Sequence, residues 1–405
     1  MLDDFGQRIR DIILSEMDLS RELSDEEICD LIGSVVSREA RDRPMTIKDR
    51  AELERTIFNS LRKLDVLQEL VDDRDVTEIM VNGPNDIFYE KAGRIQRFKG
   101  HFSSEEKLED VIQQIVGRHN RVVNQASPIV DTRLSDGSRV NIVLNPISIG
   151  GSAVSIRKFP EHPMSMERLV EIEALSPEVA RLLQILTQAK YNIFISGGTG
   201  SGKTTFLNAL SQYIPDDERI ITIEDSAELQ LLGAKNIVRL ETRNANTDGV
   251  TPITIRDLIR TALRMRPDRI IVGECRGAEA LDMLQAMNTG HDGSLSTGHA
   301  NSPHDIISRI ETMVLQGQDF PLNAIRQQIA SGIDIIVQLG RLRDKSRRVL
   351  EVSEVDGFTD GEIVLHTLYR FEETAVLDSG RIQGFLKKAG TLCHTDKLMA
   401  AGLSV

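Results

Sequence analysis

A glycine-rich segment that carries one lysine, residues 197–204, has the composition of a phosphate-binding loop. Its letters, GGTGSGKT, match the pattern G-x-x-x-x-G-K-[ST]. It follows the apolar run 191–195 and precedes the helical stretch 204–213, which is the context that this pattern requires. Glycines let consecutive backbone N–H groups turn toward one anion, and the start of a helix adds partial positive charge. The sequence therefore predicts a nucleotide-phosphate site.

Within this loop, the side chains of two residues have the chemistry that ATP and Mg²⁺ require. We expect Lys203 to reach the β and γ phosphates of ATP and the Thr204 hydroxyl to coordinate Mg²⁺. The predicted nucleotide-binding residues are Gly198, Thr199, Gly200, Ser201, Gly202, Lys203, Thr204 and Thr205.

Carboxylates follow two further apolar runs, 219–223 and 269–272. Glu224, Asp225 and Glu228 come after the first run, and Glu274 comes after the second. In open α/β sheets the ligand lies at the carboxyl ends of the strands, so these acids should converge on the same phosphates. One of them can hold Mg²⁺, directly or through water, while another orients the attacking water.

Two histidines, His291 and His299, lie in the segment 289–300, which is rich in glycines and hydroxyls. A single histidine is usually a packed or surface residue. Two in a flexible loop near the ends of the acidic strands fit a sensor of the γ phosphate. Both interpretations remain open from the residues alone.

Two sets of arginines could contact a nucleotide from outside the loop. One set recurs every four residues on the predicted helix 254–264, either as a solvated face or as a charged surface presented to a neighbouring subunit. The other set belongs to an earlier part of the chain and raises the same question. The two sets are Arg256, Arg260 and Arg264, and Arg133, Arg139 and Arg157.

The hydrophobic periodicity divides the chain into four parts. Residues 1–64 carry helix-spaced apolar positions and predict a bundle of three short helices. Residues 65–159 contain short β-rich runs, turn signals and one helix, 105–119, which predict an α+β domain. Residues 160–166 are proline-rich and read as a linker. From 167 to 405, strands alternate with helices, which predicts a mostly parallel sheet covered on both faces. An antiparallel hairpin, 348–355 with 362–369, should follow.

The composition of the 405 residues bounds the function classes. A formal charge of −13 disfavours nucleic acid as the main ligand. The three cysteines are isolated in the sequence, so no Cys-x-x-Cys pair is available to bind zinc or to form a redox couple. No apolar run reaches the length of a membrane span. The acidic N-terminus does not resemble a secretory signal, so we expect a cytoplasmic protein without a direct membrane span.

Taken together, the motifs resemble the type II/type IV secretion ATPase superfamily. The phosphate loop, the Glu224-Asp225-x-x-Glu228 box, the Gly273-Glu274 strand end and the paired histidines occur in the order typical of that superfamily. Three further segments are similar to the Tad/Flp pilus assembly branch, which is CpaF-like; they are 131–139, 240–244 and 263–270.

The resemblance implies a fold, an assembly and residue roles. The fold would be α/β, with a RecA-like P-loop NTPase domain, a preceding PAS-like α+β domain and an N-terminal helical bundle. The assembly would be a homohexamer that hydrolyses ATP to drive a pilus platform in the inner membrane. Glu228 would be the general base, Glu274 would support Mg²⁺, and Glu224 with Asp225 would shape the acidic box.

The resemblance also assigns the remaining site residues. His291 and His299 would be the paired histidines, and Arg157, with Arg133 and Arg139, would engage the γ phosphate. The zinc-binding cysteines of the type II branch are absent, so no structural metal is expected. A type IV secretion or conjugation motor shares the same catalytic parts, and a RecA-like DNA translocase is a third possibility. The sparse aromatic residues, 4%, argue against the third, because few rings are available to stack on bases.

Overall fold

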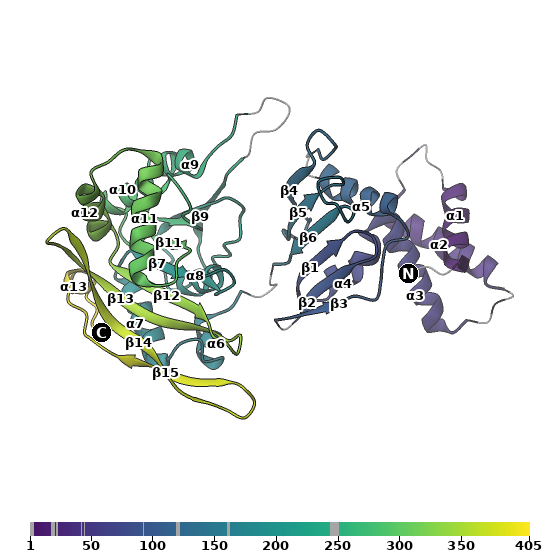
Figure 1. The fold of residues 1–405 in the computed structure, drawn as a ribbon. Helices are drawn as coiled ribbons and strands as arrows, with labels where there is room; N and C mark the ends of the chain where they lie inside the picture. Colours follow the sequence, from purple (N-terminus) through teal and green to yellow (C-terminus); the bar gives the residue numbers. More distant parts are fainter. Residues whose placement is uncertain are drawn as a thin grey trace. The chain divides into compact units, whose positions relative to one another are not determined.

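The computed structural model describes residues 4–17, 21, 23–41, 43, 45–91, 93–118, 122–159, 163–243 and 251–405. The chain divides into two compact units, Met1–Glu161 and His162–Val405 (Figure 1). Residues 160–162 of the expected linker lie outside the described residues.

The first unit begins with the three helices that the sequence predicts. They are α1 (Asp4–Glu16), α2 (Asp25–Glu39) and α3 (Ile47–Arg62). Ser24 and Thr46 start α2 and α3 with capping boxes, in which side chains accept hydrogen bonds from otherwise unpaired N–H groups. Ile9, Ile28 and Ile57 are fully buried in a small core shared by the three helices. Packing of these apolar faces holds the bundle together.

A six-stranded antiparallel sheet forms the rest of the first unit. Its strand order is β3-β2-β1-β6-β5-β4. Helix α5 (Glu105–Gly117) packs its apolar side chains against the sheet's buried residues, Ile79, Val140 and Ile156 among them. Residue 119, the expected end of this helix, lies outside the described residues. The strands are β1 (Val76–Asn82), β2 (Ile87–Lys91), β3 (Arg94–Arg97), β4 (Ile129–Arg133), β5 (Arg139–Val143) and β6 (Ala153–Arg157), after the short helices η1 (Asp65–Leu67) and α4 (Gln68–Asp72).

The second unit is built on a nine-stranded sheet of order β15-β14-β13-β12-β7-β11-β10-β8-β9. The six strands from β12 to β9 run parallel to one another, as the alternating pattern predicts. These parallel strands are β7 (Ile193–Gly197), β8 (Arg219–Glu224), β9 (Asn236–Glu241), β10 (Arg269–Val272), β11 (Leu295–Gly298) and β12 (Ile335–Arg341).

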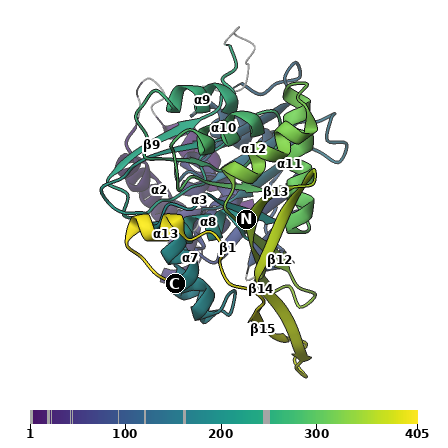
Figure 2. The same ribbon diagram turned by 90° about the vertical axis from the view of Figure 1, so that its left-hand side faces the viewer.

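Helices cover both faces of the parallel region, and Figure 2 shows the two layers on either side of the strands. Successive residues of β7 alternate between them: Ile193 and Ile195 pack with one layer, and Phe194 packs with the other. The first layer contains α6 (Met166–Glu171), α7 (Pro177–Gln188) and α8 (Lys203–Ser211). The second contains α9 (Ile255–Ala262), α10 (Ala280–Asn288), α11 (Pro303–Gly317) and α12 (Leu322–Gly332).

The C-terminal region is more extensive than the single hairpin that the sequence predicts. Three antiparallel strands extend the sheet, and a short helix follows them. They are β13 (Arg347–Thr359), β14 (Glu362–Val376), β15 (Ile382–Lys388) and α13 (Asp396–Ala401). Antiparallel strands added to a parallel sheet are common in folds of this kind.

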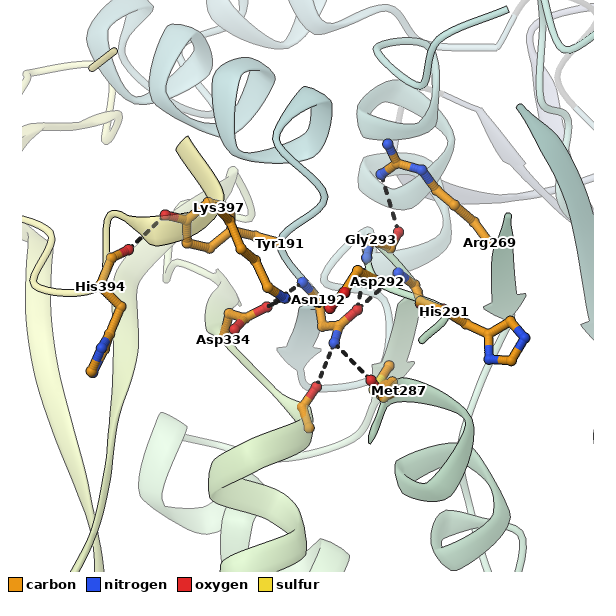
Figure 3. Close-up of polar contacts among 12 residues, drawn as sticks. Tyr191, Asn192, Arg269, Met287, His291, Asp292, Gly293, Asp334, His394 and Lys397 are labelled. Atoms are coloured by element: carbon orange, nitrogen blue, oxygen red, sulfur yellow. Dashed lines mark hydrogen bonds and ion pairs between the residues drawn. The ribbon is translucent and has the colours of Figure 1, made fainter. Parts of the chain in front are cut away.

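Polar contacts fasten α13 to the amino ends of the parallel strands (Figure 3). Lys397 Nζ lies 2.8 Å from a carboxylate oxygen of Asp292 and 2.7 Å from one of Asp334. The Tyr191 hydroxyl donates to the carbonyl of His394 at 2.6 Å. Burial, together with nearby acids, raises the pKa of Tyr191 to about 12, so the hydroxyl stays protonated and can donate.

No helix among the described residues is long and apolar enough to span a membrane.

Candidate active site at the carboxyl edge of the parallel sheet

The glycine-rich loop connects β7 to α8, as the sequence predicts. Gly200 and Gly202 have φ angles of 70° and 95°, a region of backbone space that favours glycine. Lys203 is the first residue of α8, and its Nζ donates to the carbonyls of Gly197 at 3.0 Å and Gly198 at 3.1 Å. The lysine therefore lies folded over the loop, at the start of a helix where an anion is favoured.

Three other predicted residues lie at this same edge of the sheet. Glu224 is the last residue of β8, Glu274 follows β10 by two residues, and His299 comes directly after β11. These strands run parallel to β7 or to its neighbours, so their carboxyl ends meet at the loop. The structure thus brings together the phosphate loop, both acidic strand ends and one histidine.

A continuous series of contacts joins Lys203, His299 and Glu274. Lys203 Nζ lies 3.3 Å from His299 Nδ1, and His299 Nε2 lies 2.7 Å from Glu274 Oε1. An ammonium group can only donate, so Nδ1 must accept and the ring proton belongs on Nε2, the nitrogen next to the carboxylate. His299 therefore couples the phosphate-binding lysine to the carboxylate of the neighbouring strand.

The electrostatics of this series keep the histidine neutral and the glutamate ionised. Burial lowers the pKa of His299, and the charge of Lys203 lowers it further. Burial alone would raise the pKa of Glu274, but a hydrogen bond from Arg276 and nearby positive charges hold that pKa below its ordinary value. Glu274 is therefore a carboxylate at neutral pH, as a Mg²⁺ ligand must be.

Arg276 is a site residue that the sequence reasoning missed. Its Nη2 lies 2.6 Å from Glu274 Oε2, and its Nη1 lies 3.7 Å from a carboxylate oxygen of Asp225. The available signal was its position, two residues after Glu274 at the end of an acidic strand. The motif patterns assign no role to this position, so the residue type alone does not predict one.

Glu224 is buried and differs from the other acids of the site. The residue is 4% exposed, and its Oε1 accepts hydrogen bonds from the backbone N–H groups of Glu228 at 2.8 Å and Leu229 at 2.9 Å. Burial raises the pKa of Glu224 to about 7, although the two N–H groups act in the opposite direction. A Cβ atom at Gly273 would lie 2.8 Å from Glu224 Cγ, so the two chain segments are in close contact. This carboxyl shapes the turn that carries Glu228.

The raised pKa of Glu224 makes stability depend on pH. The folded pKa of about 7 exceeds the ordinary 4.5, so burial of the ionised form costs stability. That cost is absent below pH 4.5, develops as the pH rises to 7, and is complete above it. Glu224→Gln removes the cost and should stabilise the protein, relative to wild type, by about 2 to 3 kcal/mol more at pH 8 than at pH 5.

Urea unfolding at the two pH values measures this difference. Glu362→Gln, at an exposed position of β14, is the matched control and should show little pH-dependent change. An equal effect of Glu224→Gln at both pH values would contradict the assignment.

His291 does not join His299, contrary to the expectation of paired histidines in one loop. The intervening residues include a buried strand, β11, rather than a flexible segment. Since Leu295 pairs with Ile193 at the start of β7, His291 lies at the amino edge of the sheet, away from the phosphate loop. Its Nδ1 lies 3.2 Å from the carbonyl of Ala286, and Figure 3 shows its ring turned away from Lys397.

The arginine stripe of α9 has a structural explanation. Arg256 Nε and Arg260 Nε donate to the two carboxylate oxygens of Asp282 at 2.7 and 2.9 Å. Asp282 lies on α10 and its side chain is 6% exposed. These two arginines therefore tie α9 to α10. Arg260 and Arg264 are nevertheless exposed, and a contact of this face with a neighbouring subunit stays a prediction.

The three arginines of the first unit form one row. Arg133 pairs with Arg139 across β4 and β5, and Arg139 pairs with Arg157 across β5 and β6. Directly paired residues project from the same face of a sheet, and this face is opposite the one that packs on α5. The row continues to Glu78, which pairs with Arg157, and the contact of its three arginines with a nucleotide stays a prediction.

The oxygen groups of the site fit Mg²⁺. Thr204 in the first turn of α8, Glu274 and Asp225 offer hydroxyl and carboxylate oxygens, the ligands that this ion prefers. Among the described residues, no group of three or more histidine, cysteine, aspartate or glutamate side chains could hold a metal ion. Mg²⁺ usually binds through one or two protein ligands together with phosphates and water, so two such residues would be enough, and the roles of Thr204 and Glu274 stay predictions.

Comparison with known proteins identifies the family. The profile of the family described as "Type II/IV secretion system protein" matches residues 60–383. The chain belongs to this family, which supports nucleotide binding and an ATPase motor. The Tad/Flp-like segment 240–244 ends outside the described residues, and its branch assignment stays a prediction.

Individual relatives cover most of the chain. A putative conjugal transfer protein of Mycobacterium tuberculosis is 31% identical over 344 residues, which are 79% of this chain and 97% of that protein. The type IV secretion system protein PtlH of Bordetella pertussis is 33% identical over 320 residues, 73% of this chain and 94% of PtlH. The crystal structure of the pilus retraction motor PilT with bound ADP is similar in fold, with a TM-score of 0.52 and 22% identity over 76% of this chain and 82% of PilT.

Proposed function

We propose that this protein is an ATPase that hydrolyses ATP to power assembly, and in some settings retraction, of a Tad/Flp-type pilus. The observation that carries the ATPase proposal is the contact series Lys203, His299 and Glu274 at the end of a phosphate loop. A loop alone would fit many chemistries. A carboxylate held ionised beside the phosphate-binding lysine is what hydrolysis with Mg²⁺ requires in addition.

The site residues divide the chemistry between them. The loop amides and Lys203 bind the phosphates, and Thr204 with Glu274 would hold Mg²⁺, which supplies positive charge for the leaving phosphates. Glu228, placed by the turn that Glu224 supports, would orient the attacking water. The row of Arg133, Arg139 and Arg157 would stabilise the γ phosphate in the transition state.

A motor for type IV secretion or conjugation is the second candidate. The names of the relatives from Mycobacterium tuberculosis and Bordetella pertussis favour it. The pilus proposal is supported by the segments 131–139 and 263–270. Both candidates use the same site and predict the same reaction. A DNA translocase is disfavoured by the formal charge of −13.

The proposal includes an assembly and a location. The protein would work as a homohexamer in the cytoplasm and would reach the inner membrane through platform proteins. Closing of the two units around ATP would supply the mechanical step. The CpaF-like resemblance supports this arrangement, and nucleic acid is not an expected partner.

Steady-state ATPase activity measured across protein concentration, with and without DNA, tests the proposal. We expect the specific activity to rise with concentration, because subunits must assemble, and to be unaffected by DNA. Strong stimulation by DNA would favour a translocase. Specific activity that is independent of concentration, together with a monomeric mass, would contradict the hexamer.

A further inference from the structure

Arg276 lies between the ends of two neighbouring parallel strands. The backbone N–H groups of Arg276 and Gly277 both donate to Glu279 Oε1, at 2.6 and 2.8 Å. This turn separates β10 from α10 and fixes the point from which the arginine side chain extends. These two hydrogen bonds hold the backbone at Arg276 in place. The position of the guanidinium, in contrast, is set only by the contacts of the side chain.

The guanidinium contacts the carboxylates that a divalent ion would use. It lies 2.6 Å from Glu274 and 3.7 Å from Asp225, which follow β10 and β8. These two strands are adjacent and parallel, so their terminal acids converge. A positive charge at this point offsets the repulsion between the two carboxylates.

We propose that Arg276 is a placeholder cation, which neutralises Glu274 and Asp225 in the nucleotide-free site and gives way to Mg²⁺ when nucleotide binds. The inference rests on the proposed function, because it concerns the metal that accompanies the nucleotide. It adds a step that the sequence motifs do not predict, in which the Arg276 side chain and Mg²⁺ compete for the same carboxylates.

The exposure of the guanidinium makes such an exchange feasible. The Arg276 side chain is 56% exposed and that of Glu274 is 21% exposed, so water reaches the pair from the side of the arginine and screens its attraction. Arg269 is the contrast, since its side chain is 0% exposed and binds a buried carboxylate of Glu218. A residue that must be displaced in each cycle needs a weak contact, and Arg276 has one.

The structure also has room for the displaced side chain. A groove of about 390 Å³ lies beside Arg276 and is lined by His299, Asp305 and Arg309, among others. Asp305 is the one carboxylate among its lining residues, and it could receive the released guanidinium. The groove thus gives the arginine a second position close to the site.

Binding of a fluorescent ADP at varied Mg²⁺ concentration tests the exchange. ADP lacks the γ phosphate, so an effect of Arg276 on that group cannot contribute. Arg276→Ala should bind ADP no better than wild type in EDTA, because Glu274 and Asp225 then carry uncompensated negative charge. It should reach half of the Mg²⁺-dependent change at a roughly two- to fivefold lower Mg²⁺ concentration than wild type, since one competing ion pair is removed. Arg276→Lys keeps the charge and should lie closer to wild type.

Arg309→Ala is the matched control, because Arg309 lines the same groove without a contact to Glu274 among the described residues. It should leave the Mg²⁺ dependence unchanged. An unchanged or higher Mg²⁺ requirement in Arg276→Ala would overturn the proposed exchange. ADP binding by the wild type that does not depend on Mg²⁺ concentration would also overturn it. Failure of wild type to bind ADP at all would instead contradict the proposed function.

Discussion

Glu274→Gln is expected to bind ATP with nearly wild-type affinity and to release phosphate roughly 100-fold more slowly. The phosphate loop and Lys203 remain intact in this variant, so binding survives. The neutral amide cannot support Mg²⁺ as a carboxylate does, and it breaks the charge balance with Arg276. Single-turnover phosphate release and equilibrium ATP binding, measured on the same preparation, separate the two effects.

Glu241→Gln provides the control for this experiment. Glu241 also ends a parallel strand, β9, and pairs in register with Glu224, but it is exposed. The control variant should lose little activity. Undiminished turnover in Glu274→Gln would remove Glu274 from the catalytic site.

Arg269→Ala is expected to cause the largest loss of stability, about 3 to 5 kcal/mol. Arg269 is fully buried, and its guanidinium binds both carboxylate oxygens of Glu218, at 2.5 and 3.0 Å, and the carbonyls of Thr187 and Gly293. Removing it leaves a buried carboxylate without its main partner and empties the space around it. The free energy of unfolding from chemical denaturation measures the loss.

Two further variants make that prediction specific. The double change Arg269→Met with Glu218→Leu removes both charges and should recover much of the stability, since an apolar pair has no desolvation cost. Arg343→Ala removes an exposed ion pair with Glu373 and should cost far less, because exposed ion pairs contribute little stability. If Arg269→Ala cost no more than Arg343→Ala, the buried pair would not stabilise the sheet.

Local patterns were enough to predict the core of the site. The glycine spacing fixed the phosphate loop, and the apolar runs before Glu224 and Glu274 marked parallel strands whose carboxyl ends must meet. The helical periodicity of the first 62 residues likewise identified three helices. In these segments the local sequence determines the structure, through the backbone conformation that glycine allows in the loop and through the spacing of buried apolar residues in the strands and helices.

Other features depend on contacts between distant residues and left no local signal. The composition of 289–300 suggested a loop, yet β11 forms there because neighbouring strands bury it on both sides. That strand separates His291 from His299. The partner of Arg256 and Arg260, Asp282, is more than twenty residues away in the chain. Strand β15 and helix α13 are stabilised by β14 and by Asp292 and Asp334, which the tail sequence alone cannot reveal.

Phosphate release by the wild-type protein and by Lys203→Ala, with ATP and Mg²⁺ in excess, is the most direct test of the central claim. Lys203 contacts both the loop carbonyls and His299, so its loss should remove phosphate binding and interrupt the series to Glu274. We expect Mg²⁺-dependent release in the wild type and at least a 100-fold loss in the variant. Equal release by the two proteins, or no release by the wild type at any concentration, would contradict it.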